Sequence, residues 1–144
     1  MAKLASTNVF GDLTVSRDIK VNGDTNVEGT LSATTKNFLI PHPNKSGMML
    51  RHGSLEGPEN AVYVRGTITQ DKIINLPDFW EGLIDKETIT VTITPIGKTQ
   101  DLFISEIKDN KIFIESEETL LEDIKFFYVA FAERKDIPKM MVEF

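Results

Sequence analysis

The N-terminal part of the chain repeats a pattern of apolar and polar positions every six residues. Residues 11–34 divide into four units, which read GDLTVS, RDIKVN, GDTNVE and GTLSAT. The third and fifth positions of a unit are mostly apolar, and residues two apart lie on the same face of a β-strand. The Gly-Asp pairs that open two of the units are typical of turns. The pattern predicts short strands with one apolar face, formed by Leu13, Val15, Ile19, Val21, Val27 and Leu31.

Four hexads are too few to bury this apolar face within one chain. A single-chain β-helix takes about three hexads for each coil, so the segment would complete little more than one coil. Identical chains that wind about a common axis would instead give the apolar positions a shared interior. We therefore predict an intertwined, trimeric β-stalk over residues 1–36, with the first ten residues as an attachment segment. A β-meander packed on the following domain is the alternative.

From residue 37 onward, period-2 segments alternate with turn signals, as in an antiparallel β domain. Residues 78–84 are expected to form a helical turn capped by Asp78, and Asp109-Asn110 a hairpin turn. The segment ETITVTITP predicts a strand with its threonines outward, and IKFFYVAFA a central strand buried on both faces. We predict a mainly β fold, in which residues 37–144 form a compact, antiparallel β-sandwich-like domain. The expected strands cover residues 36–40, 61–68, 72–76, 87–95, 102–107, 111–115 and 124–132.

The chain ends in an apolar segment, MMVEF. Chain ends are usually polar and frayed, so an apolar end indicates packing against a protein surface. We predict that this segment is a docking tail, which packs on its own domain, on a neighbouring subunit or on the particle to which the protein attaches. Its apolar members are Met140, Met141, Val142 and Phe144.

Composition and charge argue against several classes of partner. The chain of 144 residues has a formal net charge of −6, and its 16 Lys and Arg residues are scattered, so nucleic acid is not an expected partner. There is no cysteine, which excludes disulfides, thiolate catalysis and cysteine-bound zinc. No apolar run has the length of a signal peptide core or a membrane span, so we expect neither signal-directed export nor membrane insertion.

Residues 36–67 hold the densest special chemistry in the sequence. Both histidines, His42 and His52, lie here on either side of a turn signal, together with three of the six prolines. Their spacing matches no metal motif, so we interpret both as structural histidines and expect neither a metal nor a cofactor.

The same stretch contains charged residues framed by glycine and proline. We interpret Arg51, His52, Glu56, Glu59 and Arg65 as a salt-bridge network that fixes an irregular loop or the register between subunits. Glu56 and Glu59 as the acid–base pair of a small hydrolase is the competing interpretation. It is disfavoured because the chain after Thr67 offers no further acidic residue in a similar setting, and we expect no enzymatic activity.

The aromatic residues allow two interpretations. Tyr63, Phe79 and Trp80 could present a stacking platform for sugars, but core packing is the preferred interpretation. The four aromatic residues of the run near the C-terminus are expected in the core; they are Phe126, Phe127, Tyr128 and Phe131.

Residues 36–132 carry an ordered series of motifs that resembles a known domain. The motifs read IPHP, LRHGS, EGPE and YVRG, followed by LPDFWE and TITPIG. In this order they resemble a domain of virion structural proteins of tailed bacteriophages, including fibre-like proteins of cyanophages. The hexads before them look like the slender shafts that often carry such domains.

The resemblance implies a structural component of a virion, made in the host cytoplasm: a fibre, a capsid decoration, or a tail or neck accessory protein. Its expected partners are two further copies of itself and other virion proteins. The family implies no catalytic residues. A carbohydrate- or receptor-binding module at a fibre tip, which would bind a host-surface glycan through Trp80 or Tyr63, is the alternative function.

Overall fold

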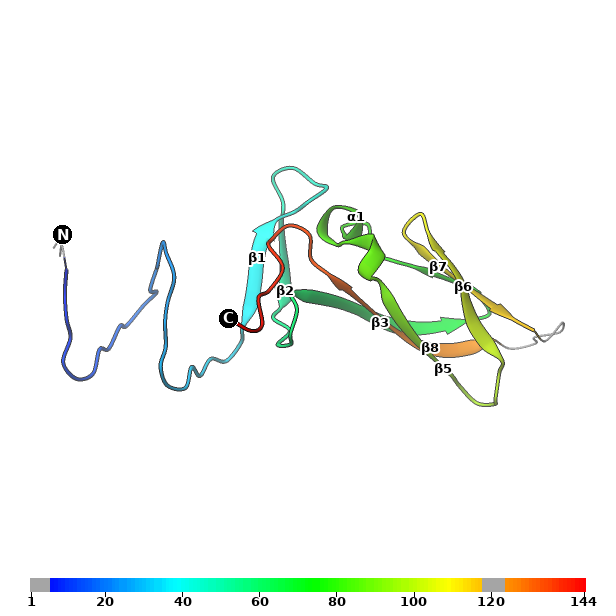
Figure 1. Cartoon of the computed structure of the whole chain (residues 1–144), viewed down its shortest axis with the longest axis horizontal. Coiled ribbons are helices and arrows are strands. Elements are labelled where there is room, and N and C mark those ends of the chain that lie inside the picture. Colours follow the sequence, from blue (N-terminus) through cyan, green and yellow to red (C-terminus); the bar gives the residue numbers. More distant parts are fainter. Residues whose placement is uncertain (1–5, 118–123) are drawn as a thin grey trace. The chain divides into compact units, whose positions relative to one another are not determined.

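The computed structural model describes residues 6–117 and 124–144. The chain divides into two compact units, of which the first ends at Thr34 and the second covers Thr35–Phe144 (Figure 1). Each unit is described separately.

The first unit keeps the six-residue period in its backbone but forms no sheet. Residues 6–34 contain neither a helix nor a strand, and no backbone hydrogen bond joins them to one another or to other described residues. The backbone bends at residues 16–17, 22–23, 28–29 and 34, so that each predicted hexad becomes a short extended stretch between two bends. Bends therefore fall at the unit boundaries, whereas hydrogen-bonded turns and strand pairing are absent from this part of the described chain.

The second unit is mainly β, and all its strand pairs are antiparallel. A short helix and one 3-10 turn precede the fifth strand. The elements are β1 Asn37–Pro41, β2 Met49–Gly53, β3 Ala61–Thr69, β4 Ile73–Asn75, α1 Trp80–Leu83, the 3-10 turn Lys86–Thr88, β5 Thr90–Pro95, β6 Leu102–Lys108, β7 Lys111–Ser116 and β8 Lys125–Glu133.

The strands form one hairpin and two three-stranded sheets. Strands β1 and β2 pair only with each other, whereas the sheets have the orders β3-β8-β5 and β4-β7-β6 (Figure 1). Inward-facing side chains of both sheets, of the hairpin and of α1 meet in one hydrophobic cluster, which is consistent with a sandwich-like domain. Its fully buried large side chains are Trp80, Phe126, Ile74, Leu83, Ile84, Ile112 and Ile114.

Two local predictions are confirmed. Asp109 and Asn110 have φ of 50° and 58°, which is the left-handed pair that a tight two-residue hairpin turn requires, and they join β6 to β7. Strand β3 has Val62 and Val64 on its inner face and Tyr63 on its outer face, so its period-2 pattern predicts its orientation correctly.

Three local predictions are wrong. Strand β8 is central but is buried on one face only, because its outer face lies uncovered and leaves Phe127 55% exposed. Asp78 does not cap α1, whose first residue follows Phe79 and has no side-chain cap. Thr88 does not face outward: its hydroxyl donates to the carbonyl oxygen of Asp85 and accepts from the backbone N–H of Glu133.

Candidate functional site

Aromatic rings and one guanidinium attach the β1–β2 hairpin to the rest of the second unit. The ring of His52 lies 5.1 Å from that of Phe38 and 5.3 Å from that of Phe79, and the ring of His42 lies 6.2 Å from Phe79. The guanidinium carbon of Arg134 lies 4.1 Å from the centre of the Phe38 ring. Both histidines therefore contact Phe79, and the sequence prediction of structural histidines agrees with these contacts.

Burial lowers the pKa of His52 below its ordinary value, and the nearby positive charge of Arg134 lowers that pKa further. His52 is therefore held as a neutral imidazole at pH 7. Among the described residues, no three His, Asp or Glu side chains lie close enough together to hold a metal ion.

Among the described residues, no salt bridge joins members of the predicted network to one another. Glu56 pairs with Lys36, whose ammonium group donates a hydrogen bond to the carboxylate and lowers the pKa of Glu56. No ion pair in the described part of the chain involves Arg51, Arg65 or Glu59. A network between subunits stays a prediction.

The residues predicted to build the stalk and the docking tail have exposed side chains. The six hexad residues are between 42% and 70% exposed, and the apolar residues of the tail are at least 44% exposed. The tail is attached just before it begins, since the side-chain amide of Asn60 donates to the carbonyl oxygen of Pro138 and Lys139 pairs with Glu133. Both segments therefore present apolar side chains to solvent.

The outer face of the β3-β8-β5 sheet presents three rows of side chains. Strand register places Tyr63 opposite Phe131, Arg65 opposite Val129, and Thr67 opposite Phe127, and it adds a threonine of β5 to each row. The result is an apolar column along β8 with a column of threonines on one side. These threonines are Thr90, Thr92 and Thr94.

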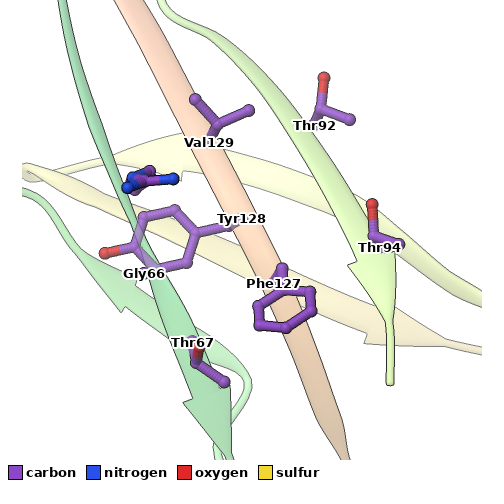
Figure 2. A pocket seen from close by; sticks show the side chains of 8 residues that line it. Gly66, Thr67, Thr92, Thr94, Phe127, Tyr128 and Val129 are labelled. Atoms are coloured by element: carbon purple, nitrogen blue, oxygen red, sulfur yellow. The ribbon is translucent and has the colours of Figure 1, made fainter. Parts of the chain in front are cut away.

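Two hollows lie on this part of the molecule and share Arg65. One has a volume of about 510 Å³ and lies over the sheet, where Figure 2 shows Phe127 between Thr67 and the threonines of β5. The other has a volume of about 600 Å³ and is lined by β2, by β3 and by residues 54 and 55. Arg51 and Tyr63 line this second hollow.

The aromatic residues considered for a sugar platform do not share one exposed surface. Trp80 is fully buried, and its indole N–H has no partner among the described residues, so it cannot stack on a ligand. Tyr63 is 50% exposed, and its ring packs 5.7 Å from that of Phe131 on the outer face. Only Tyr63 of the predicted pair is therefore available to a glycan.

The sequence correctly predicted that Thr92 and Thr94 face outward, but it assigned them no function, and it missed Phe127 as a surface residue. A strand with threonine at every second position has one face toward solvent. Residues directly opposite these threonines on the neighbouring strand lie on the same face. This signal was present for β5, but the apolar run of β8 concealed the outward position of Phe127.

Comparison of the chain with protein-family models, with curated proteins and with solved structures finds no match. In the described residues, no helix has the length and apolar character that a membrane span needs.

Proposed function

We propose that the chain is a structural component of a tailed-phage virion, which assembles as a homotrimer and docks to the particle. In this proposal the hexads form an intertwined β-stalk, and the second unit is the sandwich-like domain that the stalk carries. The resemblance of residues 36–132 to phage virion domains supports the setting. The exposed apolar side chains of the hexads support assembly through the stalk.

One observation carries the proposal: the first unit repeats its backbone bends and its apolar side chains with the same six-residue period and leaves the latter exposed. Isolated exposed apolar residues are common on protein surfaces, but a regular series of them marks an interface. Among the described residues, the backbone N–H and C=O groups of the extended stretches have no backbone partners, which is the requirement for pairing with another chain.

Three chains are the smallest number that suits this pattern. Two extended strands form a ribbon whose faces both stay in water, and such a ribbon is at best marginally stable. Three strands around an axis enclose one apolar face from each chain. Each hexad then supplies one wall, and neighbouring chains can satisfy the backbone groups.

The docking function is assigned to the ends of the chain. The tail residues Met140, Met141, Val142 and Phe144 are exposed and follow a segment that is fixed to the second unit through Asn60 and Glu133. Exposed methionines adapt to irregular apolar surfaces. The tail, or the first ten residues, would contact other virion proteins.

The oligomeric state tests the proposal. We expect light scattering of the intact chain to give three times the 16.2 kDa of one chain. The double variant Ile19→Asn, Val21→Asn should fall to monomer, because it places amides in the shared interior. Lys20→Asn changes the polar position between them and should remain trimeric. A monomeric intact chain would contradict the proposal.

A chain that begins at Lys36 separates two modes of assembly. If the stalk holds the trimer together, the shortened chain is monomeric and keeps its β fold by circular dichroism. If the shortened chain remains trimeric, the second unit assembles by itself, and the assignment of the hexads as the trimer interface is wrong.

Glycan recognition is the second candidate function. It is favoured by one observation, the exposed Tyr63 beside a hollow that also contains arginine side chains.

A further inference from the structure

The outer face of the β3-β8-β5 sheet combines cationic, aromatic and hydroxyl groups in register. Across the three strands the rows read Tyr63–Phe131–Thr90, Arg65–Val129–Thr92 and Thr67–Phe127–Thr94. An uncovered sheet face of a small domain is commonly polar throughout. This face instead keeps an apolar column along β8 in contact with water, and Phe127 and Tyr63 are each about half exposed.

Arg65 lies at the border of both hollows. It lines the hollow over the sheet together with Phe127 and Thr94, and it lines the hollow beside β2 together with Tyr63 and Arg51. A ligand that occupied both hollows would pass Arg65, with the threonines of β5 in one hollow and Arg51 in the other.

The two guanidinium groups at this site lack an acidic partner in the described chain. The nearby Glu56 pairs with Lys36, and Glu133 pairs with Lys139. Arg51 and Arg65 thus remain available, although the chain has a net charge of −6. A guanidinium presents a planar set of donors that matches carboxylate and phosphate groups in two parallel hydrogen bonds. The charge at this site is complementary to an anion.

The remaining groups suit a sugar. Half-exposed aromatic rings such as Tyr63 and Phe127 offer flat apolar faces, and the apolar C–H face of a pyranose ring can pack on them. Thr92 and Thr94 provide hydroxyl groups that both donate and accept, which matches the hydroxyl groups of a sugar.

We propose that this face binds an acidic oligosaccharide. Arg65 and Arg51 hold its carboxylate or phosphate groups, Tyr63 and Phe127 pack against its rings, and the threonines of β5 bind its hydroxyl groups. The proposal develops the second candidate function and does not depend on the trimer or on a place in a virion.

Single-stranded nucleic acid is another polyanion that packs on aromatic rings. Nucleic acid is disfavoured because grooves that bind it line the phosphate backbone with many cationic side chains. This face offers three, Arg51, Arg65 and Lys125, in a protein of net charge −6.

The first experiment presents the intact chain to a panel of oligosaccharides that carry uronates or phosphates, together with their neutral counterparts. Oligogalacturonate and its methyl ester form the matched uronate pair, and a phosphorylated oligosaccharide and its dephosphorylated form are the matched phosphate pair. Binding to acidic members and not to the neutral counterparts is expected. Binding to no acidic member, or equal binding to the methyl ester, overturns the proposal.

Variants then place the binding on this face. Arg65→Ala should weaken the best binder about tenfold or more, as expected when a hydrogen bond to a charged group is lost. Phe127→Thr should weaken it about twofold to tenfold through the lost ring contact. Lys111→Ala removes an exposed cation from the other sheet and should leave affinity unchanged. If all three variants bind with the affinity of the unmodified chain, the ligand does not bind at this face.

Two further measurements separate this proposal from its rivals. Competition by a single-stranded DNA oligomer of equal charge would overturn the assignment to a sugar. Light scattering on the same samples shows whether Arg65→Ala instead dissociates an oligomer, in which case Arg65 belongs to a subunit contact and the glycan site is wrong. Failure of glycan binding in a stable trimer leaves the virion proposal unaffected.

Discussion

His52 shows how one side chain can couple the stability of the fold to pH. Its ring lies between Phe38 of the hairpin and Phe79, and burial together with the charge of Arg134 lowers its pKa. The folded state therefore resists protonation, whereas the unfolded chain takes up a proton near the ordinary value of 6.5. Because the unfolded state binds more protons in this range, the free energy of unfolding decreases as pH falls below about 6.5.

We expect the urea midpoint of the intact chain to fall between pH 7 and pH 5. His52→Phe keeps a ring between Phe38 and Phe79 but cannot titrate, so it should show a shallower fall over the same range. Carboxylates contribute equally to both proteins and cancel in this comparison. Identical pH profiles for the two proteins would show that His52 does not carry the effect, and the NMR titration of its ring protons gives an independent measure of the pKa.

Single residues were predicted correctly where local periodicity alone decides their environment. Val62 and Tyr63 lie on opposite faces of β3 because side chains alternate along any strand. Phe127 was predicted to be buried because its neighbours are apolar, but its exposure depends on whether another layer covers β8. That is a property of the tertiary structure, which no local pattern contains.

At the scale of elements, the short helix and the loop 42–47 are fitted tightly to each other. The side-chain amide of Asn44 donates to the carbonyl oxygen of Asp78 over 2.6 Å. A Cβ at Gly82 would lie 2.5 Å from Cβ of Pro43 and would also collide with the Asn44 side chain. The glycine thus serves close approach of the loop rather than an unusual backbone angle.

Gly82→Ala is therefore expected to destabilise the protein by about 1–3 kcal/mol through overpacking, although alanine normally favours a helix. The matched control is Glu81→Ala on the exposed side of α1, which should change stability by less than about 0.5 kcal/mol. Urea unfolding of both variants provides the measurement. A Gly82→Ala protein as stable as its control would show that the loop can move away at no cost.

Elements with a strong alternating pattern or a defined turn were predicted closely. The hairpin of β6 and β7 follows from Asp109-Asn110, because the aspartate–asparagine pair accepts left-handed backbone angles. The start of β5 was misplaced because Thr88 fits the alternation but belongs to a 3-10 turn. Its hydroxyl binds the end of β8, and this contact between distant segments outweighs the local preference for a strand.

At the scale of the whole molecule, folding of the second unit is expected to be independent of the apolar tail. Deletion of residues 140–144 removes side chains that are largely exposed, so the free energy of unfolding should change by less than about 0.5 kcal/mol. Arg134→Ala, slightly upstream, should cost about 1 kcal/mol, because it removes the guanidinium from Phe38 and the ion pair with Asp136. A large loss on tail deletion would show that the tail packs on its own unit.

The division into two units could be predicted from the sequence, since the hexads end where the period-2 segments begin. The predicted boundary after residue 36 lies close to that of the structure, which follows Thr34. The partner of the hexads could not be derived in the same way. Exposed apolar groups show that contacts are missing from a chain, but they do not identify the chain that supplies them.

The pairing of β1 with β2 has a mechanical consequence. Residues 35 and 36 connect the first unit to β1. The first residue of β1, Asn37, pairs with the last residue of β2, Gly53, so tension on the N-terminal segment acts on the open end of the hairpin. Tension in this direction separates one residue pair after another instead of shearing all of them together. The bonds of Lys36 with Glu56 and with the backbone of Ser54 resist first. After the Asn37–Gly53 pair, the Phe38–His52 pair adds its contacts with Phe79 and Arg134. Once they yield, the opened hairpin adds about 50 Å of extended chain, and it can absorb a sudden load before the β3-β8-β5 sheet experiences it.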